Sequence, residues 1–314
     1  MTRAIIIGYG SIGARHAAVL SELGFDITVV TKRSDCHYES FSSLSRCLGV
    51  IDKGYFIIAN ETSKHLDTLR MLEPLLEQPG TKVLIEKPLS DSFKPHDSFS
   101  QLAEVKVAYN LRFDPMILRI REHITGRKVL SVQVYAGQYL PSWRSGGSYS
   151  ESYSAKRDLG GGVIRDLSHE LDYINWLFGP WQKVVATSAK VSSLAIETED
   201  VCSCLISTKG CHHITLELNY LDRNTQRTIT VNLEDDTLHC DLVNRTLTIN
   251  RQKIHIPIHR NATYAEMHRS VIAGESLSCT YEEAVRIMAL ITGIEYSTRF
   301  QKWITYEEVV HDLR

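Results

Sequence analysis

The stretch "IIIGYGSIGARH" (5–16) decides how the first part of this chain is interpreted. Three consecutive isoleucines are typical of a buried strand, and they lead into Gly8, Gly10 and Gly13, spaced G-x-G-x-x-G. In a strand–turn–helix unit, the first glycine permits the sharp turn, the second lets a pyrophosphate approach the backbone, and the third lets helix and strand pack closely. The stretch therefore predicts a dinucleotide site, with a purely structural turn as the alternative.

The end of the next expected strand indicates which dinucleotide to expect. An NAD site usually has an acidic residue there, which holds the ribose 2′-hydroxyl. This chain instead has Thr31, Lys32, Arg33 and Ser34, whose hydroxyls and cations suit a 2′-phosphate. The sequence therefore favours NADP(H) over NAD(H), which stays the alternative. Lys32 and Arg33 could also be ordinary solvated loop charges.

The pattern of apolar residues predicts two architectures in succession. As far as residue 113, short apolar strands alternate with helices, which is typical of a doubly wound parallel sheet. The expected strands are 4–8, 26–31, 55–59, 82–85 and 106–109, and the expected helices are 11–23, 63–72 and 98–104. We therefore expect an α/β Rossmann domain over residues 1–113.

Beyond residue 113 the apolar residues alternate with polar ones, which is typical of antiparallel strands with one covered face. Such strands are expected near 129–135, 214–220, 228–233 and 247–256, and helices are expected over 116–123, 167–177 and 280–298. The second predicted domain, 114–314, is therefore an α+β domain with an antiparallel sheet.

The composition is that of an ordinary globular protein. The 314 residues are 43% hydrophobic and 23% charged, with a formal net charge of −2, so the basic excess of a nucleic-acid-binding protein is missing. No apolar run is long enough to span a bilayer, and the first residues resemble a buried strand rather than a secretory signal. The seven scattered cysteines indicate reduced thiols in a cytoplasmic protein without a metal site. A metal or redox pair at Cys202 and Cys204 is the alternative.

Six stretches carry a family resemblance. They are "GYGSIGARH" (8–16), "ANETSKH" (59–65), "IEKPLS" (85–90), "AYNLRFDP" (108–115), "GGGVIRDLSHELDYINWLFG" (160–179) and "TYEEAVRIMALITGIEYSTRFQKWITY" (280–306). In this order they resemble the glucose–fructose oxidoreductase / inositol dehydrogenase (Gfo/Idh/MocA) family. The resemblance implies hydride transfer between a nicotinamide and a hydroxyl or keto carbon of a sugar or sugar derivative. It also implies that residues 114–314 form a substrate-binding and oligomerisation domain on a large, open, mostly antiparallel sheet. A homodimer or homotetramer would pair through this sheet, with no nucleic-acid or membrane partner.

The resemblance assigns the proton-moving residues. Lys87 would hydrogen-bond the reacting hydroxyl, and the peptide before Pro88 tends to be cis in the family. His169 would be the general acid/base, which suits an imidazole near neutral pH. Asp166 and Asp172 lie three residues before and after His169, so on one helix all three would share a face. The commoner family pattern has four residues from the aspartate to the histidine, which leaves the role of Asp166 open.

Further contacts are expected on both sides of the reaction. The expected cofactor contacts are Gly8, Tyr9, Gly10, Ser11, Ile12, Gly13, Thr31, Lys32, Arg33, Asn60, Glu61, His65, Glu86, Lys87, Trp143 and Arg144. The expected substrate contacts are Arg112, Tyr149, Tyr153, Lys156, Arg157 and Asp172.

The cations among the substrate contacts indicate an acidic ligand group, such as a sugar carboxylate or a nucleotide-sugar phosphate. An ordinary polar loop is the alternative. Two other functions stay open: redox-neutral sugar chemistry with a retained nicotinamide, and a non-catalytic dinucleotide-binding regulatory protein.

Overall fold

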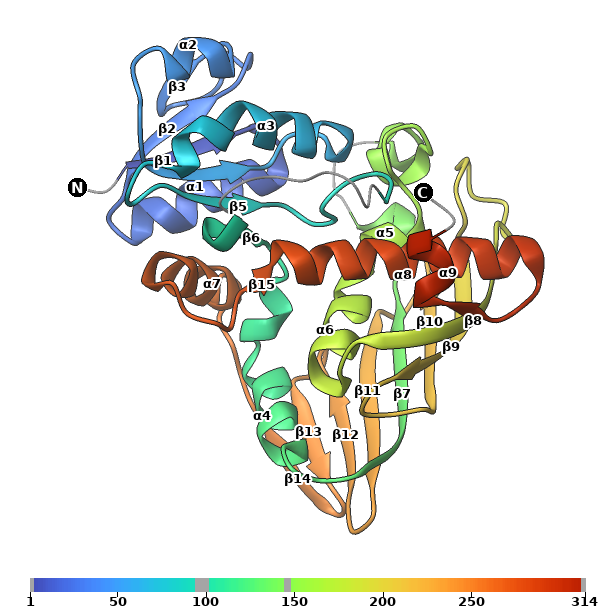
Figure 1. Ribbon diagram of the computed structural model, residues 1–314. Coiled ribbons are helices and arrows are strands. Elements are labelled where there is room, and N and C mark those ends of the chain that lie inside the picture. The colour runs from blue at the N-terminus through green and yellow to red at the C-terminus, as the bar shows by residue number, and fades with distance from the viewer. Residues whose placement is uncertain (1–2, 94–101, 144–147, 312–314) are drawn as a thin grey trace. The chain divides into compact units, whose positions relative to one another are not determined.

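The computed structural model of the protein describes residues 3–93, 102–143 and 148–311 (Figure 1). Contacts divide the chain into two compact units. Unit 1 comprises Met1–Asp91, His96–Phe113 and His259–Val285, and unit 2 comprises Ser92–Pro95, Asp114–Ile258 and Arg286–Arg314. The contacts thus also divide the chain between residues 113 and 114, but they return a late segment to unit 1. The functional domains 1–113 and 114–314 stay a prediction.

Unit 1 is built on a seven-stranded sheet of order β15-β6-β5-β4-β1-β2-β3. Its strands are β1 (Arg3–Ile7), β2 (Asp26–Val30), β3 (Glu39–Phe41), β4 (Tyr55–Ile58), β5 (Lys82–Ile85), β6 (Val105–Val107) and β15 (Cys279–Thr280). All neighbours are parallel except β15 and β6. The isoleucines of β1 are buried at its centre. The predicted doubly wound parallel sheet is confirmed.

The helices of unit 1 flank this sheet. They are α1 (Ser11–Glu22), α2 (Leu44–Leu48), α3 (His65–Leu76), α7 (Ala262–Ala273) and the short 3-10 turns η1 (Thr62–Lys64), η2 (Leu102–Glu104) and η3 (Asn110–Phe113). The predicted end of α3 at residue 72 is wrong, because the helix runs through Pro74 and buries Leu76. A proline there costs only the hydrogen bond of a last-turn amide. Of the helix expected over 98–104, the described part is the 3-10 turn η2, and 98–101 lie outside the described residues.

Unit 2 is built on a nine-stranded sheet of order β14-β13-β12-β11-β7-β10-β9-β8-β16. Its strands are β7 (Val129–Gly137), β8 (Trp181–Ala189), β9 (Val201–Thr208), β10 (Ile214–Asn219), β11 (Gln226–Leu233), β12 (Thr237–Asp241), β13 (Thr246–Ile249), β14 (Gln252–His255) and β16 (Ile304–Thr305). Only β7 and β10 pair in parallel among these described strands. The predicted open, mostly antiparallel sheet is confirmed. The strand expected over 247–256 is a hairpin that turns at Asn250, where φ is +53°.

The helices of unit 2 differ from the prediction around the candidate catalytic residues Asp166 and His169. They are α4 (Pro115–Ile124), α5 (Val163–Asp166), α6 (Ser168–Phe178), α9 (Tyr306–His311) and the part of α8 (Tyr281–Phe300) that follows Val285. Asp166 ends α5, whereas His169 lies in the first turn of α6. The prediction that Asp166, His169 and Asp172 share one helix is wrong. Leu167, with φ −97° and ψ +30°, interrupts the helical backbone between them.

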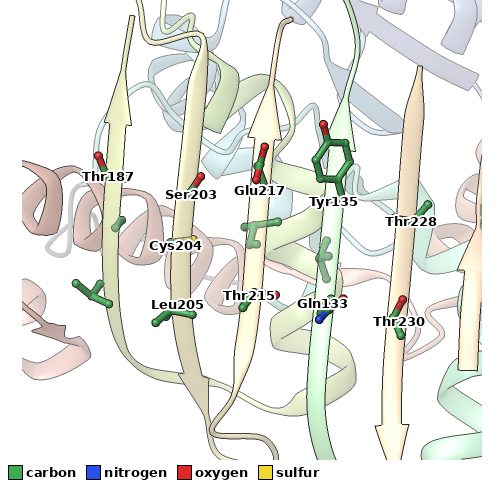
Figure 2. A pocket seen from close by; sticks show the side chains of 14 residues that line it. Gln133, Tyr135, Thr187, Ser203, Cys204, Leu205, Thr215, Glu217, Thr228 and Thr230 are labelled. Carbon is green, nitrogen blue, oxygen red and sulfur yellow. The ribbon is translucent and has the colours of Figure 1, made fainter. Parts of the chain in front are cut away.

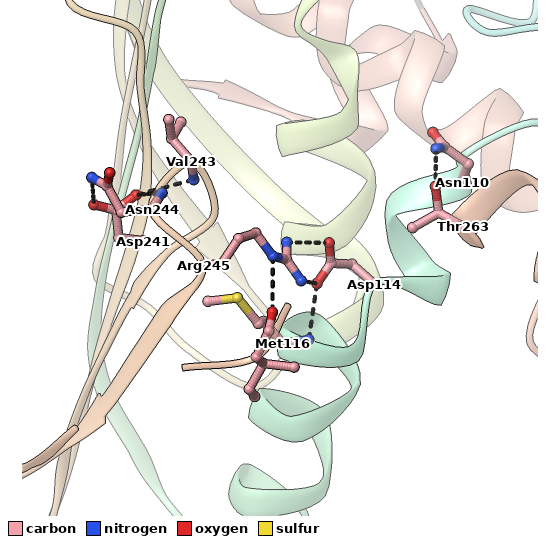
Figure 3. A network of polar contacts seen from close by, with 9 residues as sticks. Asn110, Asp114, Met116, Asp241, Val243, Asn244, Arg245 and Thr263 are labelled. Atoms are coloured by element: carbon pink, nitrogen blue, oxygen red, sulfur yellow. Dashed lines mark hydrogen bonds and ion pairs between the residues drawn. The ribbon is translucent and has the colours of Figure 1, made fainter. Parts of the chain in front are cut away.

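Polar side-chain contacts hold the start of α4 in unit 2 and join η3 to α7 in unit 1 (Figure 3). In unit 2, Asp114 caps α4 through the amide of Met116 at 2.9 Å and accepts two Arg245 hydrogen bonds at 2.7 and 3.0 Å. A bidentate pair of this kind fixes direction as well as distance. In unit 1, Asn110 donates to the Thr263 hydroxyl at 2.7 Å, which ties α7 to η3.

Candidate functional site

The glycine loop of unit 1 has the geometry of a phosphate-binding turn. Gly8 has φ +101°, and a Cβ there would lie 2.5 Å from the Ala59 carbonyl oxygen. A Cβ at Gly13 would lie 2.1 Å from the Gly8 carbonyl oxygen, whereas a Cβ at Gly10 would meet nothing within 4 Å. Gly8 and Gly13 are therefore required by the fold, and Gly10 faces open space. Among the described residues no side chain caps α1, so its first amides can bind an anion.

The residues around Gly10 frame that space. Ser11 is exposed and Ile12 half-buried in the first turn of α1. The Tyr9 ring packs edge-on against Tyr38, with 6.4 Å between ring centroids. Burial raises the pKa of Tyr9, and the nearby Cys36 thiol raises it further. The loop after β2 thus lies beside the glycine turn, as a dinucleotide-binding fold requires for adenosine contacts.

The cations after β2 have an acidic partner that the sequence interpretation missed. The Arg33 guanidinium donates through Nε to Asp35 Oδ1 at 2.8 Å, and its amide donates to the Thr31 hydroxyl at 3.1 Å. The hydrogen bond to Asp35 raises the pKa of Arg33 and lowers the pKa of Asp35. Lys32 is exposed. The loop therefore carries both a cation and a carboxylate, and the acid two residues after Arg33 was the available signal.

The residues after β4 lie at the same carboxyl edge of the sheet. Asn60 donates to Thr68 Oγ1 at 2.8 Å, while its buried Oδ1 has no partner among the described residues. The two ring nitrogens of His65 lie 3.2 Å from the Asn60 carbonyl and 3.1 Å from the Pro88 carbonyl. Burial lowers the pKa of His65. Glu61 pairs with Lys64 on the surface. His65 thus joins the loop after β4 to the loop after β5.

Lys87 follows β5, the next strand of the parallel sheet. Its side chain is half-buried, and the peptide between Lys87 and Pro88 is cis. The Lys87 amide donates to Glu86 Oε2 at 3.1 Å, and Glu86 Oε1 lies 2.7 Å from His16 Nε2. Unit 1 therefore brings the glycine loop, Asn60, His65, Glu86 and Lys87 to the edge where open α/β sheets bind ligands.

Arg112 is the one expected substrate contact in unit 1. Its side chain is 1% exposed, and its guanidinium pairs with Glu283 at 2.8 Å. Glu283 also accepts the Thr280 amide at 2.9 Å, at the start of α8. The Arg112 cation is therefore engaged with a carboxylate of its own unit.

In unit 2, a tight glycine turn leads into the helices that carry Asp166 and His169. A Cβ at Gly161 would lie 2.2 Å from the Tyr153 carbonyl oxygen, and one at Gly162 would lie 2.3 Å from Glu199 Oε1. Asp166 is buried and accepts a 2.6 Å hydrogen bond from the Tyr220 hydroxyl. Asp172 is also buried, whereas His169 is half-buried and so accessible to a ligand.

Trp143 borders a small pocket of unit 2. The pocket is lined by Leu140, Pro141, Trp143, Ser148, Tyr149, Glu151, Ser152 and Ser154. The Trp143 ring packs edge-on against Tyr220, with 5.2 Å between centroids, so Tyr220 links this wall to Asp166. The buried Nε1 of Trp143 has no partner among the residues that the structure describes. Arg144 lies outside the described residues.

The other expected substrate residues of unit 2 are engaged with a neighbouring loop. Lys156 Nζ lies 2.7 Å from Glu197 Oε1, and Arg157 donates to the Glu197 carbonyl at 3.0 Å. The ion pair raises the pKa of Lys156 and lowers the pKa of Glu197. The Tyr149 hydroxyl accepts the Ala195 amide at 3.1 Å, and Tyr153 is 38% exposed. Lys156 and Arg157, the two cations of unit 2 among the expected substrate contacts, thus have partners within that unit.

One face of the large sheet is exposed within unit 2. Figure 2 shows side chains of β8, β9, β10, β7 and β11 side by side on it, among them Leu205, Thr215 and Glu217. Leu205 is 47% exposed, whereas Ile214 and Leu216 on the opposite face of β10 are buried.

The remaining features concern metals, thiols and membranes. All seven cysteines are free thiols. Over the described residues, no cluster of His, Cys, Asp or Glu could hold a metal ion. The described helices include none that is long and apolar enough to cross a membrane.

Comparisons with known proteins agree with this geometry. Residues 119–239 match the model of the GFO/IDH/MocA C-terminal domain. The chain is 29% identical over 164 residues to an uncharacterised oxidoreductase of Synechocystis sp., a match that covers 50% of this chain and 43% of the relative. The chain thus spans less than half the length of that relative.

Two solved structures share the fold along nearly the whole chain. Levoglucosan dehydrogenase, in complex with NADH and levoglucosan, is 14% identical with a TM-score of 0.82, covering 97% of this chain and 98% of that one. The WlbA dehydrogenase of Bordetella pertussis, in complex with NADH and UDP-GlcNAcA, is 19% identical with a TM-score of 0.75, covering 97% of both chains. The family resemblance of the sequence motifs is confirmed.

Proposed function

We propose that this chain is a nicotinamide-dependent oxidoreductase of the GFO/IDH/MocA family, because residues 119–239 match the model of its C-terminal domain and a glycine-loop Rossmann fold precedes them. It transfers a hydride between the cofactor and a hydroxyl or keto carbon of a sugar or sugar derivative. The observation that carries this proposal is the carboxyl edge of unit 1. There Gly10, which faces open space, lies in the turn after β1, and the half-buried Lys87 follows β5 of the same parallel sheet.

The residues at that edge fit a dinucleotide. The free amides at the start of α1 suit a pyrophosphate, and the orphan Oδ1 of Asn60 offers an acceptor after β4. Thr31, Lys32 and Arg33 suit a 2′-phosphate, so we favour NADP(H), and Asp35 keeps NAD(H) as the alternative. The nicotinamide supplies the hydride chemistry when it is bound.

The chain's own residues move the proton. Lys87 binds the reacting hydroxyl as a hydrogen-bond donor, and His169 exchanges the proton of that hydroxyl as general acid/base. Asp166, held by Tyr220, supports the polar surroundings of that exchange. The backbone that carries Lys87 is held by the Glu86 carboxylate and the cis Lys87–Pro88 peptide.

The substrate class that we propose is a sugar or sugar derivative. Levoglucosan dehydrogenase and WlbA support this choice, since their complexes hold an anhydrosugar and a nucleotide-linked sugar acid. An acidic or nucleotide-linked sugar would have to draw Lys156 and Arg157 from Glu197, and Arg112 from Glu283. Neutral sugars therefore belong in the same screen, because they need no such exchange.

The test is a screen for hydride transfer. The purified protein is mixed with oxidised or reduced NADP or NAD and with neutral sugars, sugar acids and nucleotide sugars, and nicotinamide absorbance is followed. We expect a change with at least one sugar class. Conversion of a sugar without net change in absorbance would favour redox-neutral chemistry instead. Tight dinucleotide binding without any conversion would favour a regulatory protein.

The exposed face of the large sheet is the proposed oligomer interface, which gives a homodimer or homotetramer. Its half-exposed Leu205 lies among polar side chains of five strands (Figure 2). Sedimentation of the native chain and of Leu205→Asp tests this: a dimer or tetramer weakened by the substitution is expected, and a native monomer contradicts it.

The free thiols support a reducing compartment, so we propose a cytoplasmic location.

A further inference from the structure

Four buried side chains of unit 1 form a hydrogen-bonded row that ends next to Lys87. Tyr55 OH lies 2.9 Å from His268 Nδ1, and His268 Nε2 lies 2.9 Å from His16 Nδ1. His16 Nε2 lies 2.7 Å from Glu86 Oε1. The four residues come from β4, α7, α1 and the end of β5, so only the folded unit assembles this row.

The row is isolated from solvent. His16 and His268 are 0% exposed, Tyr55 is 2% exposed and Glu86 is 7% exposed. Burial in a medium of low dielectric makes every unpaired polar atom costly, so each atom of the row needs its neighbour. The row ends at Tyr55 inside the core, which excludes a path for protons to solvent along it.

One order of donors satisfies every nitrogen of the row when His268 is neutral. Burial lowers the pKa of His268 well below its ordinary value, so this ring is neutral and carries one N–H. If that N–H is on Nε2, Tyr55 donates to His268, His268 donates to His16, and His16 donates to Glu86. Every nitrogen of both rings then has a partner of the right kind, and all donors point toward the carboxylate.

The carboxylate at the end of the row is held on both oxygens. Glu86 Oε1 accepts from His16, and Oε2 accepts the backbone amide of Lys87 at 3.1 Å. The peptide from which the Lys87 side chain departs is therefore joined, through Glu86 and His16, to the helix of the glycine loop. His268 and Tyr55 in turn fix the His16 ring, as partners of a functional group commonly do.

We propose that His16 and His268 are positioning residues for Lys87, which they hold through the Glu86 carboxylate at a fixed place relative to the glycine loop. The proposal rests on the proposed function for the role of Lys87 in turnover. It also explains why α7 returns to unit 1 from the far end of the sequence, since this helix supplies the ring that orients His16. The His16 ring has a second α7 neighbour, Tyr264, edge-on at 5.5 Å.

The test compares variants that keep or remove the donor. His16→Gln and His268→Gln retain a side-chain amide, whereas His16→Leu and His268→Leu retain only bulk. His259→Gln, an exposed histidine just before α7, is the matched control. For the leucine variants we expect kcat to fall about 10- to 100-fold, the scale on which a small misplacement of a catalytic group acts. The glutamine variants should recover part of this loss, with KM for the nucleotide unchanged.

A second measurement needs no substrate. Trace acetic anhydride acetylates surface and site lysines, and mass spectrometry gives the labelling ratio of Lys87 to the exposed Lys53. We expect the leucine variants to change this ratio and the glutamine variants and His259→Gln to keep it near the native value. An unchanged ratio in both leucine variants overturns the proposal, even where no sugar is turned over and the proposed function has failed.

A merely structural role is distinguished by thermal unfolding. kcat is measured at a temperature below the unfolding transition of each leucine variant, where the protein is fully folded. A native kcat there would mean that the row only stabilises the unit, and the proposal is overturned. A kcat defect that persists in fully folded protein, with rescue by glutamine, supports it.

Discussion

The Tyr220 hydroxyl donates a 2.6 Å hydrogen bond to Oδ2 of Asp166, and both side chains are buried in unit 2. The sequence spacing associates Asp166 with His169 on one helix, but the structure separates them at Leu167 and gives Asp166 a partner that directly follows β10. Trp143 packs against the same tyrosine. Tyr220 therefore connects the wall of the small pocket to the carboxylate before the expected general acid/base.

Replacing Tyr220 with phenylalanine should lower kcat about 10-fold or more while nucleotide affinity stays unchanged. The ring remains against Trp143, but Asp166 loses a hydrogen bond of the charged kind, which contributes about 1.5–3 kcal/mol. Steady-state kinetics and nucleotide titration check this. Tyr306→Phe is the matched control, since Tyr306 packs edge-on against Trp181 with 5.4 Å between centroids. Equal activity of the two variants contradicts the role of Tyr220.

Replacing Lys87 with methionine should lower kcat about 100-fold or more, the scale of general acid–base catalysis, because methionine keeps the bulk but cannot hydrogen-bond the hydroxyl whose proton is exchanged. Titration with the preferred nucleotide should give a nearly native dissociation constant. Lys53→Met, at an exposed loop position, should leave both quantities native. Near-native turnover of Lys87→Met would mean that Lys87 does not act on the reacting hydroxyl.

Replacing Arg33 with alanine should raise KM for NADPH about 10-fold, since a charge-assisted pair with the 2′-phosphate is lost, and should leave KM for NADH nearly unchanged. Replacing Asp35 with alanine frees Arg33 from its ion pair, so preference for NADPH should increase. Initial rates with each nucleotide measure both effects. Equal changes for NADPH and NADH would exclude selection of the phosphate by Arg33.

Stability should decrease as the pH falls below about 6.5, the ordinary pKa of histidine. Burial lowers the pKa of both His65 and His268 in the folded protein. At acid pH the unfolded chain therefore binds protons that the folded chain does not, and each histidine steepens the loss by up to about 1.4 kcal/mol per pH unit. This loss continues until the pH reaches the folded pKa, and above pH ~6.5 the contribution is fully present.

Urea unfolding of the native chain and of His268→Gln between about pH 7.5 and 5 measures this effect, because the window spans the ordinary pKa of histidine. The groups that face His268 are Tyr55 and His16, with Glu86 beyond. Removing the imidazole should make the pH dependence shallower. Identical slopes for the two proteins would show that His268 takes up a proton in the folded state.

The local parts of the fold could be predicted from the sequence. The isoleucine run, the glycine spacing and the strand alternation each depend on near neighbours, and β1, α1 and the two sheet types follow from them. The predicted end of α3 was wrong because the burial of Leu76 outweighs the cost of Pro74, and burial is a property of the folded unit.

The partners of the candidate residues depend on distant segments, so most of them could not be predicted. Glu283 for Arg112, Tyr220 for Asp166 and His268 for His16 lie 54 to 252 positions away. A single sequence carries no signal for such pairs. Asp35 is different, because it lies only two residues from Arg33. The sequence alone therefore indicates that this acid can pair with Arg33 and compete with a 2′-phosphate for it.

The most direct test of the account is nucleotide binding by Gly10→Val. A Cβ at Gly10 meets nothing within 4 Å and the backbone φ there is −79°, so the variant should fold and melt like the native chain. Its side chain would instead fill the space proposed for the pyrophosphate. Fluorescence titration with NADPH and NADH should show binding to the native chain, tighter for NADPH, and little binding to Gly10→Val. Native affinity in the folded variant, or no binding of either nucleotide to the native chain, would contradict a dinucleotide at this loop.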